Sequence, residues 1–396
     1  MKIVGLITEY NPFHNGHKYH IQKAKEITGA DGVIVIMSGD FVQRGAPAMM
    51  PKHLRAEAAL KNGASLVIEL PVQYATASAE QFAFGAVSIL HGLGCVDCIC
   101  FGSECGEISS LEDLARILSE EPQAYKAALS SYLKEGNAFP LARQKALQAY
   151  CHSDNLANLL EKPNNILGVE YLKALYKLHS SMKPFTITRI SSEYHDDCLQ
   201  TEYSSASAIR NNLSEDFSSL ETQVPAEMFS LFQEHYQKSF PVEANDFSFL
   251  LKYRLLTETK DSLLSYLDVS EELANRICNQ SNAFVSFTQF CELLKTKEIT
   301  YSRVSRGLLH ILLGIKKEHT TLPLYARALG FRTDSTWVLR SIKEQASIPF
   351  FTKPTEIATF QPEALDIFAS NLYRSMITDK FKTTFSNEYE HPILRV

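Results

Sequence analysis

The sequence predicts an α/β protein whose first part is a doubly wound, Rossmann-like parallel sheet and whose second part is mainly helical. Within the first 100 residues, short apolar runs alternate with segments of helical periodicity. The apolar runs are continuous, as in parallel strands that are covered on both faces. Polar motifs follow these runs at the carboxyl ends of the predicted strands, where a doubly wound sheet binds its ligands.

Each predicted element is bounded by turn or polar residues, such as the Pro71 that closes the third apolar run. In chain order, the predicted strands are Lys2–Thr8, Gly32–Met37, Ser65–Leu70, Cys98–Phe101 and Phe185–Ile190. The predicted helices are His17–Ile27, a segment near Pro51–Lys61, Ala77–His91 and, within an insertion over residues 107–180, Leu111–Ser119, Tyr125–Lys134, Pro140–Tyr150 and Gly168–Leu178. Polar loops are expected at Ser38–Ala46 and Ser191–Glu202.

Helical patterns dominate from about residue 216 and predict a second domain. We place the boundary near 215–245, which gives residues 1–215 as the sheet domain and 216–396 as the helical domain. Turn signals at Pro241, Pro323 and Pro349 divide the second part. No apolar run reaches the roughly 18 residues of a membrane span, and no secretory signal opens the chain. We therefore expect a cytoplasmic protein with no membrane partner.

The eight cysteines are spread along the chain and do not form a disulfide framework. The spacing Cys95-x-x-Cys98-x-Cys100 suits zinc, but no second pair with ligand spacing follows it. Two of these residues lie in a predicted buried strand, where cysteine packs as a small apolar side chain. We therefore predict no metal ligands in this group.

The most specific chemical signal is the tetrad His14-Asn15-Gly16-His17, which follows the first strand and opens the first helix. A helix N-terminus binds phosphate through its free N–H groups, and Gly16 lets the backbone approach closely. Two imidazoles can donate hydrogen bonds to oxygens that gain charge at a nucleotide α-phosphate. The alternative is a pair of capping or packing histidines. Lys18 would either meet a phosphate or stay solvated.

The loop after the second strand offers further candidates. Asp40, Gln43 and Arg44 lie between Gly39 and Gly45, so this segment is either a mobile loop that reaches the substrate or a plain turn. Asp40 and Glu104 would also suit a water-mediated Mg²⁺, although neither is a firm ligand candidate.

Later positions in the first domain offer further candidates, of which Arg189 falls on the crevice side of the predicted sheet. Asn165 would either cap a helix or bind the nucleotide, and Arg189 would meet the ligand or form a surface ion pair. Ser207 and Arg210 belong to the run Ser204–Arg210, whose serines fit helix capping. Hydroxyls, free N–H groups and a guanidinium at a helix start form a second candidate phosphate site.

Residues 300–345 form a basic segment in an acidic chain. They carry eight lysines and arginines against three acidic residues, a net charge of +5 in a chain of net charge −6. Tyr301, Tyr325, Phe331 and Trp337 are interleaved with the cations. This pattern suits RNA, whose phosphates bind cations and whose unpaired bases stack on rings; the alternative is a charged helical surface around an apolar core. The cations that we expect to contact RNA are Arg303, Arg306, Lys316, Lys317, Arg327 and Arg332.

Several motifs together resemble the bacterial tRNA(Met) cytidine acetate ligases. The motifs are Gly5–His17, Gly39–Gly45, Glu69–Pro71, Phe101–Glu104, Pro163–Gly168, Ser204–Arg210, Leu308–Ile315 and Leu329–Phe331. They span nearly the whole chain, and the first two are the most specific. The histidine tetrad alone indicates only the nucleotidyltransferase superfamily of the HxGH type. Ala46 departs from the acidic residue expected in the family at that position.

The resemblance implies an ATP-dependent ligase that activates acetate as acetyl-adenylate, releases pyrophosphate and AMP, and acetylates N4 of the wobble cytidine of elongator tRNA(Met). His14, His17 and Lys18 would be catalytic, and Mg²⁺ would accompany the phosphates. No residue stands out as the base for the cytidine amine. The expected ATP site comprises Ile7, Thr8, Glu9, Tyr10, Asn11, Pro12, Phe13, His14, Asn15, Gly16, His17, Lys18, Tyr19, His20, Gly102, Asn165, Arg189, Ser207 and Arg210.

Two other functions share these features. A small-molecule adenylyltransferase, acting on nicotinate mononucleotide or phosphopantetheine, would have the same sheet and histidines but would not need the basic C-terminal half. A nucleotide-sensing RNA-binding protein without catalysis would have both halves but would not need the intact histidine pair.

Overall fold

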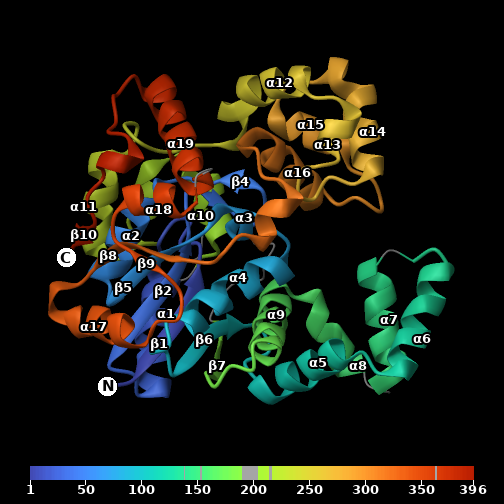
Figure 1. Cartoon of the computed structure of the whole chain (residues 1–396), viewed down its shortest axis with the longest axis horizontal. Coiled ribbons are helices and arrows are strands. Elements are labelled where there is room, and N and C mark those ends of the chain that lie inside the picture. The colour runs from blue at the N-terminus through green and yellow to red at the C-terminus, as the bar shows by residue number, and fades with distance from the viewer. Residues whose placement is uncertain (138, 152–153, 190–203, 214–215, 362–363) are drawn as a thin grey trace.

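A mostly parallel sheet of eight strands forms the centre of the computed structural model (Figure 1), in the order β10-β8-β5-β2-β1-β6-β7 with β9 beside β8. The strands are β1 Ile3–Thr8, β2 Gly32–Ser38, β5 Leu66–Leu70, β6 Cys98–Ser103, β7 Lys183–Thr188, β8 Ala326–Phe331, β9 Phe350–Phe351 and β10 Leu394–Arg395, and β3 Phe41–Val42 pairs separately with β4 Ala46–Pro47. The structure describes all residues except 138, 152–153, 190–203, 214–215 and 362–363. The predicted loop Ser191–Glu202 and the end of the predicted strand at Ile190 lie outside the described residues.

The five strands β5-β2-β1-β6-β7 run parallel in the order of a doubly wound sheet. The predicted fold class is therefore confirmed. Successive side chains of β2 enter opposite faces of the sheet: Ile34 and Ile36 join one apolar core, whereas Val33 and Val35 join the other. Both faces are buried, which explains why the strands read as continuous apolar runs.

Helices cover both faces of the sheet, and two helical groups extend from it. The first half contains α1 Asn15–Thr28, α2 Lys52–Lys61, α3 Val72–Ala75, α4 Ala79–Gly92, α5 Ile108–Glu120, α6 Gln123–Lys134, α7 Phe139–Cys151, α8 Asp154–Asn158, α9 Pro163–Lys177 and α10 Ala206–Leu213. The second contains α11 Ala226–His235, α12 Ser248–Thr257, α13 Lys260–Leu263, α14 Glu271–Gln280, α15 Phe287–Leu294, α16 Tyr301–Leu313, α17 Thr336–Gln345, α18 Pro354–Phe360 and α19 Leu365–Phe381. In Figure 1, α6 and α7 project from the insertion, and α12–α16 form a separate cluster. No helix in the described ranges is long and apolar enough to cross a membrane.

Three local predictions differ from the structure. β6 extends to Ser103 because its last residues pair with β7. α9 begins at Pro163, five residues before the predicted start at Gly168, with proline in its first turn. The predicted polar loop Ser38–Ala46 contains the small β3–β4 hairpin.

The C-terminal half returns to the sheet and is not a purely helical unit. β8 pairs antiparallel with β5, and β9 and β10 pair with β8. α17 lies on the same sheet: Val338 and Ile342 join its apolar core, and Trp337 packs so closely that a Cβ at Gly32 would lie 2.8 Å from its ring. β8 was missed because its pairing partner lies more than 250 residues earlier in the chain, and local periodicity carries no signal of such a distant pairing. β9 and β10 have only two residues each.

A buried ion-pair network holds this returning segment in place. Arg327 of β8 donates to Glu69 of β5 at 2.8 Å and to Glu388, and both carboxylates also contact Lys52 of α2, at 2.6 and 2.9 Å. Arg374 of α19 completes the shell around Glu388. Arg327 is only 2% exposed. The prediction that Arg327 contacts RNA is therefore wrong, because its guanidinium is enclosed by two carboxylates within the fold.

We predict that Arg327→Met lowers the free energy of unfolding by about 3–5 kcal/mol, because two buried carboxylates would lose a cation. Urea denaturation monitored by circular dichroism measures this change. The exposed Arg303 of α16 provides the control, since Arg303→Met should change stability by less than about 0.5 kcal/mol. A stable Arg327→Met protein with weakened RNA binding would contradict the structural role.

Candidate active site

The two histidines of the tetrad cap helix α1. The Nδ1 atom of His14 accepts a hydrogen bond from the backbone N–H of Gly16 at 3.1 Å, and Nδ1 of His17 accepts from the N–H of His14 at 3.2 Å. The two imidazoles pack against each other at a tilt of 31°, with ring centroids 3.7 Å apart. This reciprocal arrangement is a capping box made by histidines. The capping role, considered from sequence as an alternative, is thus part of the site itself.

The cap also fixes the chemistry of both rings. A neutral imidazole has one acceptor nitrogen and one N–H, and in both rings Nδ1 is the acceptor. The proton of each ring therefore lies on Nε2, which becomes a hydrogen-bond donor. Two such donors at a helix N-terminus suit an anion that gains negative charge during reaction.

Burial keeps these histidines neutral. It lowers the pKa of His14 to about 3, and the positive charges of Arg189 and Arg210 lower that pKa further. Burial also lowers the pKa of His17 well below its ordinary value, and lowers that of His20 to about 4 with the help of Arg189. At neutral pH the charge of this region therefore comes from the arginines, and the imidazoles act as uncharged donors.

Aromatic packing supports the tetrad from the preceding turn. The edge of the Tyr10 ring contacts His17, with centroids 4.8 Å apart, and also Phe13, at 4.9 Å. Tyr10 adopts a left-handed backbone conformation, with φ of 50°, although it carries a bulky side chain. Such backbone strain persists only where surrounding contacts enforce it, and it occurs frequently at functional sites.

Arg189 lies at the end of β7 beside the histidines. Its backbone N–H donates to the Ser103 carbonyl at 3.0 Å, and its guanidinium donates to Oδ1 of Asn164 at 3.3 Å. Gly102 makes room for this side chain, because a Cβ there would lie 3.1 Å from Cγ of Arg189. The predicted grouping of Gly102 and Arg189 at the carboxyl ends of the strands is therefore seen in the structure.

Glu104 and Asn165 join the end of β6 to helix α9. Both carboxylate oxygens of Glu104 accept from the start of α9, including the N–H of Asn165 at 2.8 Å, and Oδ1 of Asn165 accepts from the N–H groups of Glu104 and Cys105. Asn165 lies inside the helix, so its predicted role as the cap of α9 is wrong. Glu104 caps α9 instead, and both its oxygens are occupied.

Arg210 brings the second predicted phosphate site next to the first. Its guanidinium donates to the Asn11 carbonyl at 2.7 Å and to Oγ of Ser207 at 3.0 Å. Ser205 caps α10 by accepting from the N–H of Ala208, which confirms capping by this serine run. Arg210 thus connects the two candidate phosphate sites, because it links the loop after β1 to α10.

The loop 39–45 is fixed at both ends. Oδ1 of Asp40 accepts from the N–H of Lys52 at the start of α2, so this carboxylate has a structural partner. The side chain of Gln43 donates to the Ala77 carbonyl, and its backbone N–H donates to Oε1 of Glu9 at 2.9 Å. Arg44 lies near enough to Arg210 for its charge to lower the pKa of that guanidinium.

Helix α16 of the C-terminal half directly supports this loop. Ser305 donates to the Gly45 carbonyl at 2.9 Å, and a Cβ at Gly45 would lie 2.4 Å from the backbone nitrogen of Arg306. Gly45 also has a φ of 78°, which favours glycine. The helical cluster is therefore in contact with a loop of the candidate site.

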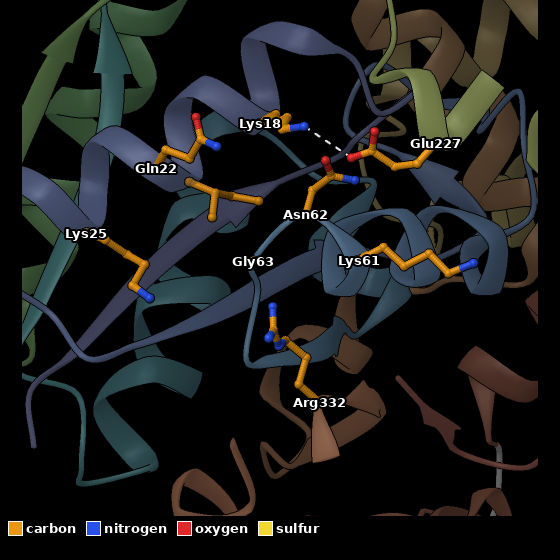
Figure 2. Close-up of a pocket in the computed structure, with 9 residues that line it drawn as sticks. Lys18, Gln22, Lys25, Lys61, Asn62, Gly63, Glu227 and Arg332 are labelled. Atoms are coloured by element: carbon orange, nitrogen blue, oxygen red, sulfur yellow. Dashed lines mark hydrogen bonds and ion pairs between the residues drawn. The ribbon is translucent and has the colours of Figure 1, made fainter. Parts of the chain in front are cut away.

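Lys18 lines a surface depression whose lining does not include the histidines of the tetrad, Arg189 or Arg210. Its Nζ pairs with Glu227 of α11 at 3.1 Å, across an open depression of about 290 Å³ (Figure 2). Lys25 and Gln22 follow Lys18 along the same face of α1, and Arg332 lies on the opposite side of the depression. This placement does not support the predicted catalytic role of Lys18.

The predicted RNA-contacting cations are divided by their surroundings. Arg306 pairs with Asp268 at 2.7 Å and its side chain is only 12% exposed, so its guanidinium is committed to the fold. Arg332 pairs with Asp334. Arg303, Lys316 and Lys317 are exposed, and they remain candidates for contact with RNA.

Sequence reasoning missed Arg55, which lies under the site. This fully buried side chain of α2 donates to the carbonyls of Glu9, Ser38, Gly39 and Met50. The local signal was a single arginine between apolar and small residues of a helix. Asn15 of the tetrad was also found to contact the carbonyls of Thr222 and Gln223, which no local pattern indicates.

These features define a nucleotidyltransferase site, and comparison with known proteins agrees. The family model described as HIGH Nucleotidyl Transferase matches residues 1–388. The tRNA(Met) cytidine acetate ligase of Thermoanaerobacter sp. (strain X514) is 41% identical over 405 residues, which cover 100% of both chains. That of Clostridium acetobutylicum is 44% identical over 388 residues, covering 94% of this chain and 95% of the relative.

Solved structures match over the full length as well. The apo structure of Thermotoga maritima TmcAL superposes with a TM-score of 0.94, and its complex with alpha-thio ATP with a TM-score of 0.91. Both are 34% identical to this chain and are covered completely. The chain belongs to the tRNA(Met) cytidine acetate ligase family.

A substitution can separate the capping hydrogen bond of His14 from its proposed role as a donor to the α-phosphate. The oxygen of an asparagine side chain lies where Nδ1 of histidine lies, so His14→Asn keeps the acceptor for Gly16 but removes the Nε2–H donor. We expect His14→Asn to retain the wild-type melting temperature within about 2 °C and to lose at least about 100-fold in acetate-dependent turnover of ATP. His14→Ala should lose both. A His14→Asn protein with wild-type turnover would contradict the donor role.

The same variant tests the protonation state. The unfolded chain binds a proton on His14 below its ordinary pKa of 6.5, whereas the native state does so only near 3. Stability should therefore fall as the pH drops from 7 to 5, and His14→Asn should lessen this fall by about 2 kcal/mol. Urea denaturation at the two pH values measures the difference. An equal fall in both proteins would show that His14 already binds its proton in the native state.

Proposed function

We propose that this chain uses ATP to activate acetate as acetyl-adenylate and then transfers the acetyl group to N4 of the wobble cytidine of elongator tRNA(Met). The observation that carries the proposal is the pair of neutral imidazole donors at the N-terminus of α1, flanked by Arg189 and Arg210. The full-length relatives, named as tRNA(Met) cytidine acetate ligases, support the choice of substrates. The neighbour crystallised with alpha-thio ATP supports ATP as the nucleotide.

In the first half-reaction, an acetate oxygen attacks the α-phosphorus and pyrophosphate leaves. Nε2–H of His14 and of His17 would donate to the α-phosphate oxygens as they gain charge. Arg189 would balance the charge of the incoming acetate and the α-phosphate, while Arg210 and Ser207 would hold the β- and γ-phosphates. Because both anions must meet at one phosphorus, positioning and charge neutralisation supply most of the rate enhancement.

Mg²⁺ would accompany ATP on its phosphate oxygens. The two carboxylates that the sequence suggested are engaged elsewhere, Asp40 at the start of α2 and Glu104 at the start of α9. The described ranges contain no group of three or more acidic, histidine or cysteine side chains arranged around a metal site. Within the part of the chain that the structure describes, no side chains form a cage for the ion.

In the second half-reaction, the cytidine amine attacks the acetyl carbon and AMP leaves. The target base must leave its stack to reach the crevice. Helix α16 lies against the loop 39–45, so RNA held by the exposed Arg303, Lys316 and Lys317 would lie beside the entrance to the crevice. Phosphate contacts of this kind position the RNA without reading its sequence.

The proposal is tested with labelled acetate, ATP and tRNA(Met). Label should enter the tRNA only with ATP, and His17→Ala should abolish it because one donor to the α-phosphate is lost. Arg303→Ala should weaken tRNA binding by several fold and leave acetate-dependent ATP–pyrophosphate exchange unchanged. Turnover with nicotinate mononucleotide or phosphopantetheine, or tRNA binding without labelling, would contradict the proposal.

A further inference from the structure

The proposed acetyl transfer needs a group that takes a proton from the cytidine amine, and the histidines cannot serve. Nδ1 of each ring is occupied by a backbone N–H, and Nε2 already carries the proton. A carboxylate at the carboxyl ends of the strands is the next candidate for this role. Four carboxylates lie at or just after the carboxyl ends of the central strands in the described ranges: Glu9, Asp40, Glu69 and Glu104.

Three of these carboxylates are committed to the fold. Asp40 is buried and accepts from α2, while Glu69 is buried between Lys52 and Arg327. Glu104 accepts from the start of α9 through both oxygens. Glu9 differs, because it is only partly buried and its Oε1 accepts a single hydrogen bond, from the N–H of Gln43. Among the described residues, no donor is recorded for its Oε2.

Glu9 is also held firmly just after β1. Its backbone carbonyl accepts from the buried Arg55 at 2.6 Å, and its Oε1 is fixed at 2.9 Å by the loop 39–45. The Glu9 carboxylate interacts electrostatically with Arg55 of α2 and with Arg210 of α10. It also interacts electrostatically with Tyr171 of α9. Arg44 adds a further cation next to Arg210.

A carboxylate that lies beside the phosphates of a bound nucleotide repels them and weakens nucleotide binding. The guanidinium groups of Arg55 and Arg210 offset its repulsion of the phosphates. We propose that Glu9 is the general base of the acetyl-transfer step, an inference that rests on the proposed function. Oε2 would accept the amine proton while Oε1 remains bound to the loop.

The proposed step is balanced. The N4 lone pair forms the C–N bond to the acetyl carbon, and the bond from that carbon to the phosphate oxygen breaks, with its electron pair leaving on AMP. The nitrogen becomes strongly acidic as the C–N bond forms, so a carboxylate is a sufficient base even between cations. The proton passes to Oε2 of Glu9 and then to water.

The test compares Glu9→Gln with the wild-type protein in the two half-reactions. Glutamine keeps an oxygen for the N–H of Gln43 but cannot take the proton. Because Glu9 also belongs to the expected ATP site, Glu9→Gln should change acetate-dependent ATP–pyrophosphate exchange too, but by far less than it changes acetyl transfer. It should slow single-turnover transfer of acetyl from preformed acetyl-adenylate to tRNA by about 100-fold or more. Glu26→Gln, on the exposed surface of α1, is the matched control and should behave as wild type.

Each other outcome overturns the assignment. Equal losses in both half-reactions would place Glu9 in nucleotide binding, and unchanged transfer would show that it is not the base. Loss of transfer caused by weaker tRNA binding would also exclude a base role, and the dissociation constant for tRNA measures this. If the wild-type protein itself exchanges pyrophosphate but never labels tRNA, the proposed function fails, and this inference fails with it.

Discussion

One buried guanidinium holds the candidate site together. Arg55 lies beneath the carboxyl ends of β1 and β2 and donates to carbonyls of both, so it sets the distance between the loop that carries Glu9 and the loop 39–45. Its hydrogen-bond partners are carbonyls, so the charge is neutralised only by carboxylates farther away. Burying such a cation is expensive. Bound ATP would offset this free-energy cost, because its phosphates would add the missing negative charge.

In the histidine tetrad, one arrangement of the two rings both caps the helix and fixes the protonation of each ring. The capping box uses Nδ1 of both rings, and for that reason alone each Nε2 must carry a proton. Burial then keeps the rings neutral, while Arg189 and Arg210 supply the charge. The site is thus organised before any ligand enters, which is the condition for electrostatic stabilisation without reorganisation.

The second half of the chain serves the first in two physical ways. β8, β9 and β10 extend the sheet, and the network of Arg327, Glu69, Lys52 and Glu388 fixes them to it. The helical cluster meets the loop 39–45 through Ser305 and Gly45. RNA bound to the helical cluster would therefore lie close to the candidate site. The two parts of the chain are in direct contact and are not independent modules.

The sequence by itself determined the parallel core, because buried strands leave continuous apolar runs, and it located the histidine tetrad, because strand, turn, glycine and helix are adjacent in the chain. It also placed Gly102 and Arg189 on the crevice side. Only the tertiary structure decided that Arg327 is an internal cation, that Lys18 pairs with Glu227, and that β8 joins the sheet. Each of these depends on partners more than 200 residues away. Local patterns report periodicity and turn chemistry, whereas the burial of a charge depends on which distant groups fold against it.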